Sequence, residues 1–372
     1  MKNIKTILFT LLSFSFVSAQ GQQVHKIVQQ YKDALTKVQT LDCKVEQLDT
    51  FVTGHVWHYH GQLSMLKNSA DSLFGFQFKA SKTVGGEALY DGLSEFQIDH
   101  KKKSYELNTM PRSYITGSPG GQLVVPELMR YQDHDYTPEL LENEQYYILR
   151  YQYPDLEEYD VRQREKKIFL NKGSYLPAKV IERQVTLDKK QVITRIITEL
   201  ELNQQAHEQA FVKNFLGTYE MTVEEPDVDV HAKLLETQVK NFELETFDGQ
   251  LISTTTQSAK LRLYDFWEVW CGPCVQSMPK VQALEEKYKK EGLEVVGVLM
   301  DKNSKDSAEK LLSRKGINFQ QTFGDQTLRE YFKVWGIPQY VLIDQEGTIK
   351  KIYQGYDKEI EDQIQSLLAE SK

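Results

Sequence analysis

The chain has 372 residues, of which 40% are hydrophobic and 26% charged, with a formal net charge of −8 and three cysteines. Length and composition are typical of a folded globular protein with two domains. The acidic balance provides no basic stripe that would neutralise phosphates, so we expect no nucleic-acid partner. Three cysteines are too few for a disulfide scaffold.

The first residues have the features of a secretory signal peptide. Lys2 and Lys5 precede an apolar run over residues 7–17, which ends in Val17-Ser18-Ala19. The run is shorter than the roughly 20 residues that cross a bilayer, which favours a cleaved signal over a retained membrane helix. We therefore predict a signal peptide over residues 1–19 and a soluble mature protein in the periplasm or otherwise outside the cytoplasm.

The next part of the chain has the pattern of one helix followed by a sheet. Apolar residues recur at helical spacing over residues 24–38, and residues 41–202 contain short aromatic and β-branched runs separated by turn signals. We predict an α+β domain with an antiparallel sheet over residues 20–222. An acidic stretch interrupted by Pro226 follows, which indicates a linker over residues 223–240.

The C-terminal part alternates strands with helices, which predicts an α/β domain over residues 241–372. Strands are expected over residues 261–266, 293–299, 340–344 and 348–353, and helices over residues 274–290, 308–313, 327–334 and 358–369.

Cys271-Gly272-Pro273-Cys274 stands where an apolar strand gives way to a helix. Free backbone N–H groups and the helix dipole favour the thiolate of Cys271 there, and only a thiolate attacks a disulfide. Cys274 lies three positions on, close enough to form a disulfide and to resolve a mixed one. A structural bridge over so short a loop would stabilise little, and a zinc site would need a second ligand pair. We predict a redox-active disulfide between Cys271 and Cys274, with no metal.

The segment from Tyr264 to Cys274 resembles the thioredoxin active site, and the resemblance covers residues 241–372. The signal sequence and the lead-in Asn241-Phe242-Glu243-Leu244 resemble the exported TlpA/ResA-like thiol-disulfide oxidoreductases, and Gly336-Ile337-Pro338 resembles their cis-proline loop. The resemblance implies a thioredoxin fold. It assigns substrate binding to Trp270, Gly272, Pro273, Ile337 and Pro338.

Two carboxylates precede the dithiol in the sequence. Asp265 lies on the apolar strand, where burial should raise its pKa and suit it to exchange a proton with Cys274, and its position resembles the buried acid of thioredoxins. A structural ion pair with Lys260 or Lys350 is the alternative. Glu268 departs from the family pattern, and it would oppose thiolate formation at Cys271 unless it points to solvent.

The resemblance implies a disulfide reductase that acts on protein substrates, uses no cofactor, and is recharged by a thiol electron donor in the membrane. Cys271 would attack the substrate, and Cys274 would resolve the intermediate with Asp265 as proton acceptor. The same dithiol could instead act as an oxidase or isomerase, because no residue here determines the direction.

The N-terminal domain resembles, in the order of its elements, the LolA-type lipoprotein-carrier half-barrel. This resemblance implies an apolar concave face that could hold a lipid or lipoprotein, so a binding protein with an accessory redox domain is an alternative.

His55, His58 and His60 lie close together in sequence, and alternation places His58 and His60 on one face. With Cys43 they could form a copper site, but we interpret the histidines as polar surface, predict no metal, and interpret Cys43 as a buried apolar residue.

Overall fold

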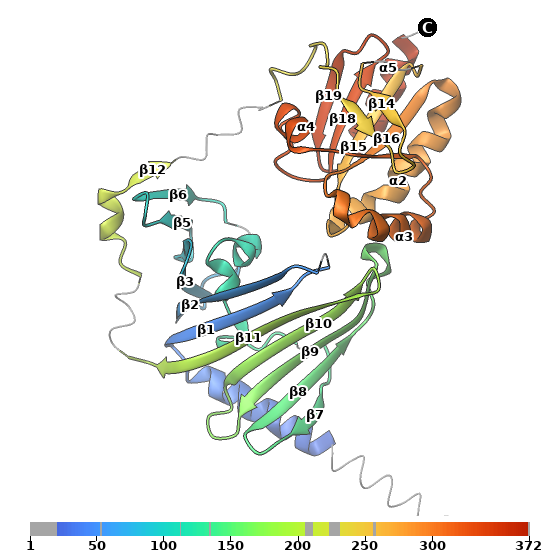
Figure 1. Cartoon of the computed structure of the whole chain (residues 1–372). Coiled ribbons are helices and arrows are strands. Elements are labelled where there is room, and N and C mark those ends of the chain that lie inside the picture. Colours follow the sequence, from blue (N-terminus) through green and yellow to red (C-terminus); the bar gives the residue numbers. More distant parts are fainter. Residues whose placement is uncertain are drawn as a thin grey trace, which may run out of the picture. The chain divides into compact units, whose positions relative to one another are not determined.

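The computed structural model describes residues 21–52, 54–111, 113–133, 135–204, 211–222, 231–255 and 258–370. The predicted signal peptide and residues 223–230 of the predicted linker lie outside these ranges. The chain forms two compact units, one built mainly from residues before 223 and one mainly from residues after 230. Figure 1 shows the first in blue to green and the second in yellow to red.

The N-terminal unit is dominated by a 12-stranded sheet with the order β12-β6-β5-β4-β3-β2-β1-β11-β10-β9-β8-β7. Its strands are β1 Thr40–Thr50, β2 Val56–Lys67, β3 Phe76–Lys82, β4 Glu87–Tyr90, β5 Glu95–Asp99, β6 Ser104–Asn108, β7 Glu139–Glu142, β8 Tyr146–Tyr153, β9 Val161–Asn171, β10 Pro177–Thr186, β11 Lys189–Leu202 and β12 Glu220–Thr222. Short 3-10 helices are η1 Ser113–Gly117, η2 Gly121–Leu123, η3 Pro126–Leu128, η4 Glu157–Tyr159 and η6 Asn214–Thr218. The prediction of a sheet-rich domain is confirmed, and the half-barrel stays a prediction.

One amphipathic helix covers the apolar face of this sheet (Figure 1). Residues 21–36 are helical, and the buried side chains of Val24, Ile27, Tyr31 and Leu35 join the same apolar core as the sheet residues. This spacing puts the four side chains on one face of the helix. The helix that the periodicity predicted is confirmed.

A buried ionic cluster lies within the same unit. Lys166 on β9 has its Nζ 2.5 Å from Oε1 of Glu127 and 3.5 Å from Oδ2 of Asp133. Tyr153 donates a 2.6 Å hydrogen bond to Oδ1 of Asp133. Both Lys166 and Asp133 line a cavity of about 450 Å³ whose wall is mostly charged and polar.

The C-terminal unit contains a five-stranded mixed sheet with the order β17-β16-β15-β18-β19. Strands β15, β16 and β17 are parallel, whereas β18 pairs antiparallel with β15 and β19 pairs antiparallel with β18. The strands are β15 Leu261–Trp267, β16 Leu293–Leu299, β17 Gln320–Phe323, β18 Gln339–Asp344 and β19 Ile349–Gln354, beside a small hairpin of β13 Glu243–Glu245 and β14 Leu251–Ser253. The helices are α2 Gly272–Tyr288, α3 Lys305–Lys315, α4 Gln326–Tyr331 and α5 Glu359–Glu370, with 3-10 turns η7 Lys289–Glu291 and η8 Lys302–Ser304.

This arrangement is the thioredoxin-like fold that the resemblance implied. All of β15 is buried, because both faces of the central strand are covered. Tyr264 and Phe266 pack into a core with Leu328 of α4, so Asp265 points to the opposite face of the sheet. None of the described helices combines the length and apolarity needed to cross a bilayer.

The C-terminal unit also includes residues just before 241. Val239 is buried in its core, and the backbone N–H of Val239 donates to the carbonyl of Gly347 at 2.8 Å. The N–H of Glu236 donates to the carbonyl of Ile349 at 2.8 Å. Residues 231–240 of the predicted linker therefore continue into the C-terminal unit, because their apolar side chains find partners along the edge of β19.

Candidate active site

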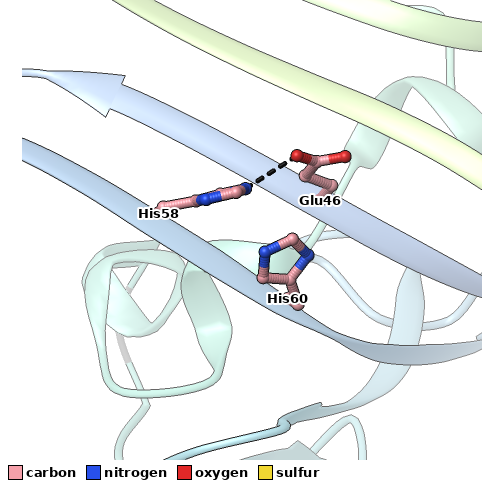
Figure 2. Close-up of side chains that lie close together, drawn as sticks. All are labelled: Glu46, His58 and His60. Carbon is pink, nitrogen blue, oxygen red and sulfur yellow. Dashed lines mark hydrogen bonds and ion pairs between the residues drawn. The ribbon is translucent and has the colours of Figure 1, made fainter.

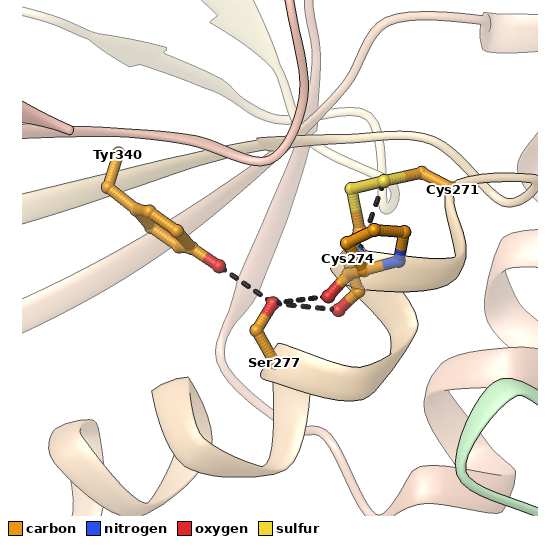
Figure 3. Close-up of a disulfide and its surroundings, with 5 residues drawn as sticks. Cys271, Cys274, Ser277 and Tyr340 are labelled. Atoms are coloured by element: carbon orange, nitrogen blue, oxygen red, sulfur yellow. Dashed lines mark hydrogen bonds between the residues drawn. A yellow bond between two sulfur atoms is a disulfide. The ribbon is translucent and has the colours of Figure 1, made fainter. Parts of the chain in front are cut away.

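Cys271 and Cys274 form a disulfide at the N-terminus of α2 (Figure 3). The central strand β15 ends at Trp267, and four residues later Cys271 is the N-cap of α2, with extended backbone dihedrals. Its Sγ accepts a hydrogen bond from the backbone N–H of Cys274 at 3.2 Å. Pro273 lies in the first turn, where a missing N–H costs nothing. A thiolate at Cys271 would thus meet a backbone donor and the positive end of the helix dipole.

Asp265 is 1% exposed in the middle of β15. Burial raises its pKa to about 8, and no cation in the described part of the chain offsets this effect. Among the described residues its Oδ1 has no hydrogen-bond partner, and Lys350 forms an ion pair with Glu236 instead. The geometry therefore gives no support to the structural ion pair that was the alternative, and Asp265 is a buried carboxyl group whose pKa is raised by burial.

Glu268 does not point to solvent. Glu268 is only 6% exposed, and its Oε2 has no hydrogen-bond partner among the described residues. Burial, and then repulsion from Asp301, raise its pKa to about 7. Near neutral pH a substantial fraction of Glu268 is therefore uncharged, which weakens the opposition to the Cys271 thiolate that the sequence predicted.

A hydroxyl pair connects α2 with β18 beneath the disulfide. Tyr340 donates to Oγ of Ser277 at 2.8 Å, and Ser277 in turn donates to the carbonyls of Pro273 and Cys274, each at 3.0 Å (Figure 3). Tyr340 is the direct cross-strand neighbour of Asp265. Burial, and then the charge of Asp265, raise the pKa of Tyr340. Ser277 and Tyr340 were not predicted from the sequence, because only the packing of α2 on β18 brings them together.

The other residues assigned by resemblance lie at the same end of the sheet. The Ile337–Pro338 peptide bond is cis, as the resemblance implied. Pro338 immediately precedes β18, whose first residue Gln339 pairs with Phe266 near the end of β15. Trp270 is 47% exposed, in keeping with a contact surface.

Trp267 and Trp335 differ in exposure. Trp267 is fully buried and its Nε1 donates to Oε1 of Gln321 at 3.1 Å, so it is a core residue. Trp335, close to the cis-proline, is 70% exposed.

The comparisons with known proteins concern this domain. Residues 235–368 match the Redoxin family model. The C-terminal part of the chain is a Redoxin domain. The Redoxin domain is similar to the thiol-disulfide oxidoreductase ResA of Geobacillus thermodenitrificans, with 33% identity over 117 residues that cover 31% of this chain and 66% of the relative. ResA of Geobacillus kaustophilus is 38% identical over 93 residues, covering 24% of this chain and 52% of the relative.

The chain thus spans about half to two thirds of the length of these curated relatives. A solved structure of a putative thiol-disulfide oxidoreductase from Bacteroides vulgatus is 27% identical, covers 37% of this chain and 99% of its own, and has a TM-score of 0.34.

The residues considered for a copper site are not all brought together. Cys43 is buried on the core face of β1, and burial, followed by the charge of Asp42, raises the pKa of its thiol to about 12. His58 and His60 are exposed on the other face of the sheet. His55 lies outside β2 and its ring packs on Trp57 at a centroid distance of 4.6 Å. A copper site that includes Cys43 is therefore wrong, because alternation turns the thiol away from the imidazoles.

Proposed function

We propose that the protein is an exported thiol-disulfide oxidoreductase that reduces disulfides in protein substrates through Cys271 and Cys274. The observation that carries the proposal is a disulfide at the N-terminus of α2 in the same domain as a buried carboxyl group whose pKa is raised to about 8. The similarity of the Redoxin domain to ResA proteins supports the same chemistry. The apolar run before Ala19 supports export.

The reaction begins with the reduced dithiol. The thiolate of Cys271 attacks one sulfur of a substrate disulfide, a mixed disulfide forms, and the other substrate sulfur leaves as a thiolate that takes up a proton. Cys274 then loses its proton and attacks Sγ of Cys271. The mixed disulfide breaks, the second substrate sulfur leaves as a thiolate that takes up a proton, and the Cys271–Cys274 disulfide forms. Two electrons have passed to the substrate, and an external dithiol, which we assign to a membrane electron donor, returns the enzyme to its reduced state.

Asp265 acts as the proton acceptor for Cys274 in this scheme. An unperturbed thiol has a pKa near 8.5, so a carboxyl group with a pKa of about 8 receives its proton with little loss of free energy. A solvent-exposed carboxylate with an ordinary pKa would be a much weaker base. Substrate backbone is held by the cis-proline segment at Ile337 and Pro338, and the surface next to Cys271 is formed by Trp270, Gly272 and Pro273.

Trapping the intermediate tests this order of events. Reduced Cys274→Ser protein, mixed with a protein disulfide substrate, should accumulate a mixed disulfide at Cys271 that is visible by mass spectrometry. The matched control is Cys271→Ser, which keeps Cys274 but should yield far less adduct, because Cys271 is the N-cap whose Sγ accepts a backbone N–H, and this position favours its thiolate. Equal adduct at both positions, or none at Cys271, would contradict the assigned roles.

A further inference from the structure

Two neighbouring strands of the N-terminal sheet bring an acidic and two imidazole side chains together, far along the chain from the redox motif. In the antiparallel register of β1 and β2, Glu46 lies directly opposite His60, and Leu48 lies opposite His58. His58 and His60 are two positions apart on β2, so alternation points both rings to the same side as Glu46. Figure 2 shows the three side chains gathered on this side of the two strands.

The distances within this group are short enough for a shared ligand. Nε2 of His58 lies 2.7 Å from Oε1 of Glu46. The rings of His58 and His60 have a centroid separation of 4.0 Å. One ligand atom from each of the three residues falls within 4.8 Å of the other two. In a tetrahedral site with metal–ligand bonds near 2.0–2.1 Å, ligand atoms are roughly 3.3 Å apart, so these atoms would need to approach one another by at most about 1.5 Å.

The donor set selects the class of ion. Two imidazole nitrogens and one carboxylate oxygen suit zinc and other divalent first-row transition metals, whereas Ca²⁺ and Mg²⁺ require mainly oxygen ligands. Cys43 cannot add a thiolate, because it lies on the buried face of β1. We propose that Glu46, His58 and His60 form a binding site for a divalent transition-metal ion on the exposed face of the N-terminal sheet.

The surroundings leave room for the ion's remaining ligands. Glu46 and His60 line a cavity of about 460 Å³, together with polar residues such as Ser81 and Thr83. Lys44 lines the same cavity, but its ammonium group is 2.8 Å from Glu199, so its charge is balanced by another carboxylate. Three protein ligands with an open side match sites that keep water or a small ligand in the fourth position, rather than closed structural sites.

Titration of the full chain with Zn²⁺ tests the site. The protein is prepared without an affinity tag and with the Cys271–Cys274 disulfide oxidised, so that the active-site thiols cannot bind the ion. We expect one saturable site per chain by isothermal titration calorimetry. Glu46→Gln, His58→Ala and His60→Ala should each weaken binding at least about ten-fold, because loss of even an outer-sphere partner of a metal ligand costs 10–100-fold.

Two matched variants and a second metal ion distinguish this cluster from the chain's remaining metal-binding side chains. His55→Ala removes a nearby histidine that is not in the cluster, and Cys43→Ala removes the buried thiol; both should retain the wild-type affinity. Co²⁺ should give visible d–d absorption with the parent chain that His60→Ala lacks, while circular dichroism checks that each variant is folded. Absence of saturable Zn²⁺ binding in the parent chain, unchanged affinity in the three cluster variants, or an equal loss in His55→Ala would overturn the proposal.

Discussion

The two units differ in whether their buried carboxyl groups lie beside a cation, and the pKa values of Glu127 and Asp265 shift in opposite directions. In the N-terminal unit, Glu127 and Asp133 are buried but lie beside the ammonium group of Lys166, and this attraction, with hydrogen bonding, holds the pKa of Glu127 below its usual value despite burial. In the Redoxin domain, Asp265 and Glu268 are buried without such an ion pair among the described residues, and their pKa values rise to about 8 and about 7. A paired buried charge leaves a costly unpaired charge when its partner is removed, whereas a buried carboxyl group without a cation has a raised pKa that suits proton exchange.

Removing the balancing cation should have the largest effect on stability. Lys166→Met keeps most of the side-chain volume but leaves two buried carboxylates without their ammonium partner. We expect the N-terminal unit to lose about 3–5 kcal/mol in free energy of unfolding, measured by urea denaturation at neutral pH. Lys44→Met is the matched control, because its ion pair with Glu199 is exposed and should contribute at most about 1 kcal/mol. Similar losses in both variants would remove the distinction between the two units.

Removing the unbalanced carboxyl group should act in the opposite direction. The folded-state pKa of Asp265 is raised, so its contribution to stability is fully present below the unfolded pKa of about 3.9 and is lost as pH rises through about 8. Asp265→Asn should therefore change stability little at pH 4 and stabilise the Redoxin domain by about 2–4 kcal/mol at pH 8. Denaturation curves at a series of pH values measure this difference.

The same variant should also turn over more slowly at neutral pH if Asp265 accepts the proton of Cys274. Glu268→Gln is the comparison for stability. It should also stabilise the domain at pH 8, but by less than Asp265→Asn, because the pKa of Glu268 is raised less. A pH-independent effect of Asp265→Asn, or an unchanged turnover rate, would assign Asp265 a purely structural role.

The hydroxyl pair beneath the disulfide should show the smallest effect. Ser277→Ala leaves the buried hydroxyl of Tyr340 without its acceptor, which should cost about 1–3 kcal/mol of unfolding free energy. Tyr340→Phe removes the donor and leaves no buried hydroxyl without an acceptor, because Ser277 keeps its bonds to the backbone carbonyls. Tyr340→Phe should therefore cost less than Ser277→Ala. Guanidinium denaturation of the oxidised protein compares the two, and a larger loss in Tyr340→Phe would contradict this assignment.

Much of the Redoxin domain could be predicted from sequence because its signals are local. The apolar run of β15 is followed directly by Cys271 and a helix, and the Ile337–Pro338 motif precedes an apolar strand. Strand β17 was not predicted, because its sequence, Gln-Gln-Thr-Phe, is too polar to indicate a buried strand. Three of its four residues are nevertheless buried in the folded domain.

Contacts that depend on packing or register could not be read from local patterns. Alternation within β2 placed His58 and His60 on one face, but the sequence alone does not show which β1 residue lies opposite. Cys43 was therefore considered as their partner, whereas the register places Glu46 opposite His60. The partners of Lys166 likewise come from a segment more than thirty residues earlier in the chain. Local patterns predict elements and their faces, whereas the pairing of elements decides which polar groups meet.

The equilibrium reduction potential of the Cys271–Cys274 pair tests the proposed reductase most directly. The protein is titrated against thiol/disulfide buffers of known potential, and the redox state is followed by the fluorescence of the tryptophans near the dithiol. We predict a potential near −270 mV, in the range of reducing dithiols, which requires a dedicated electron donor. A potential near −120 mV would make the dithiol an oxidant and contradict the proposed direction of electron flow.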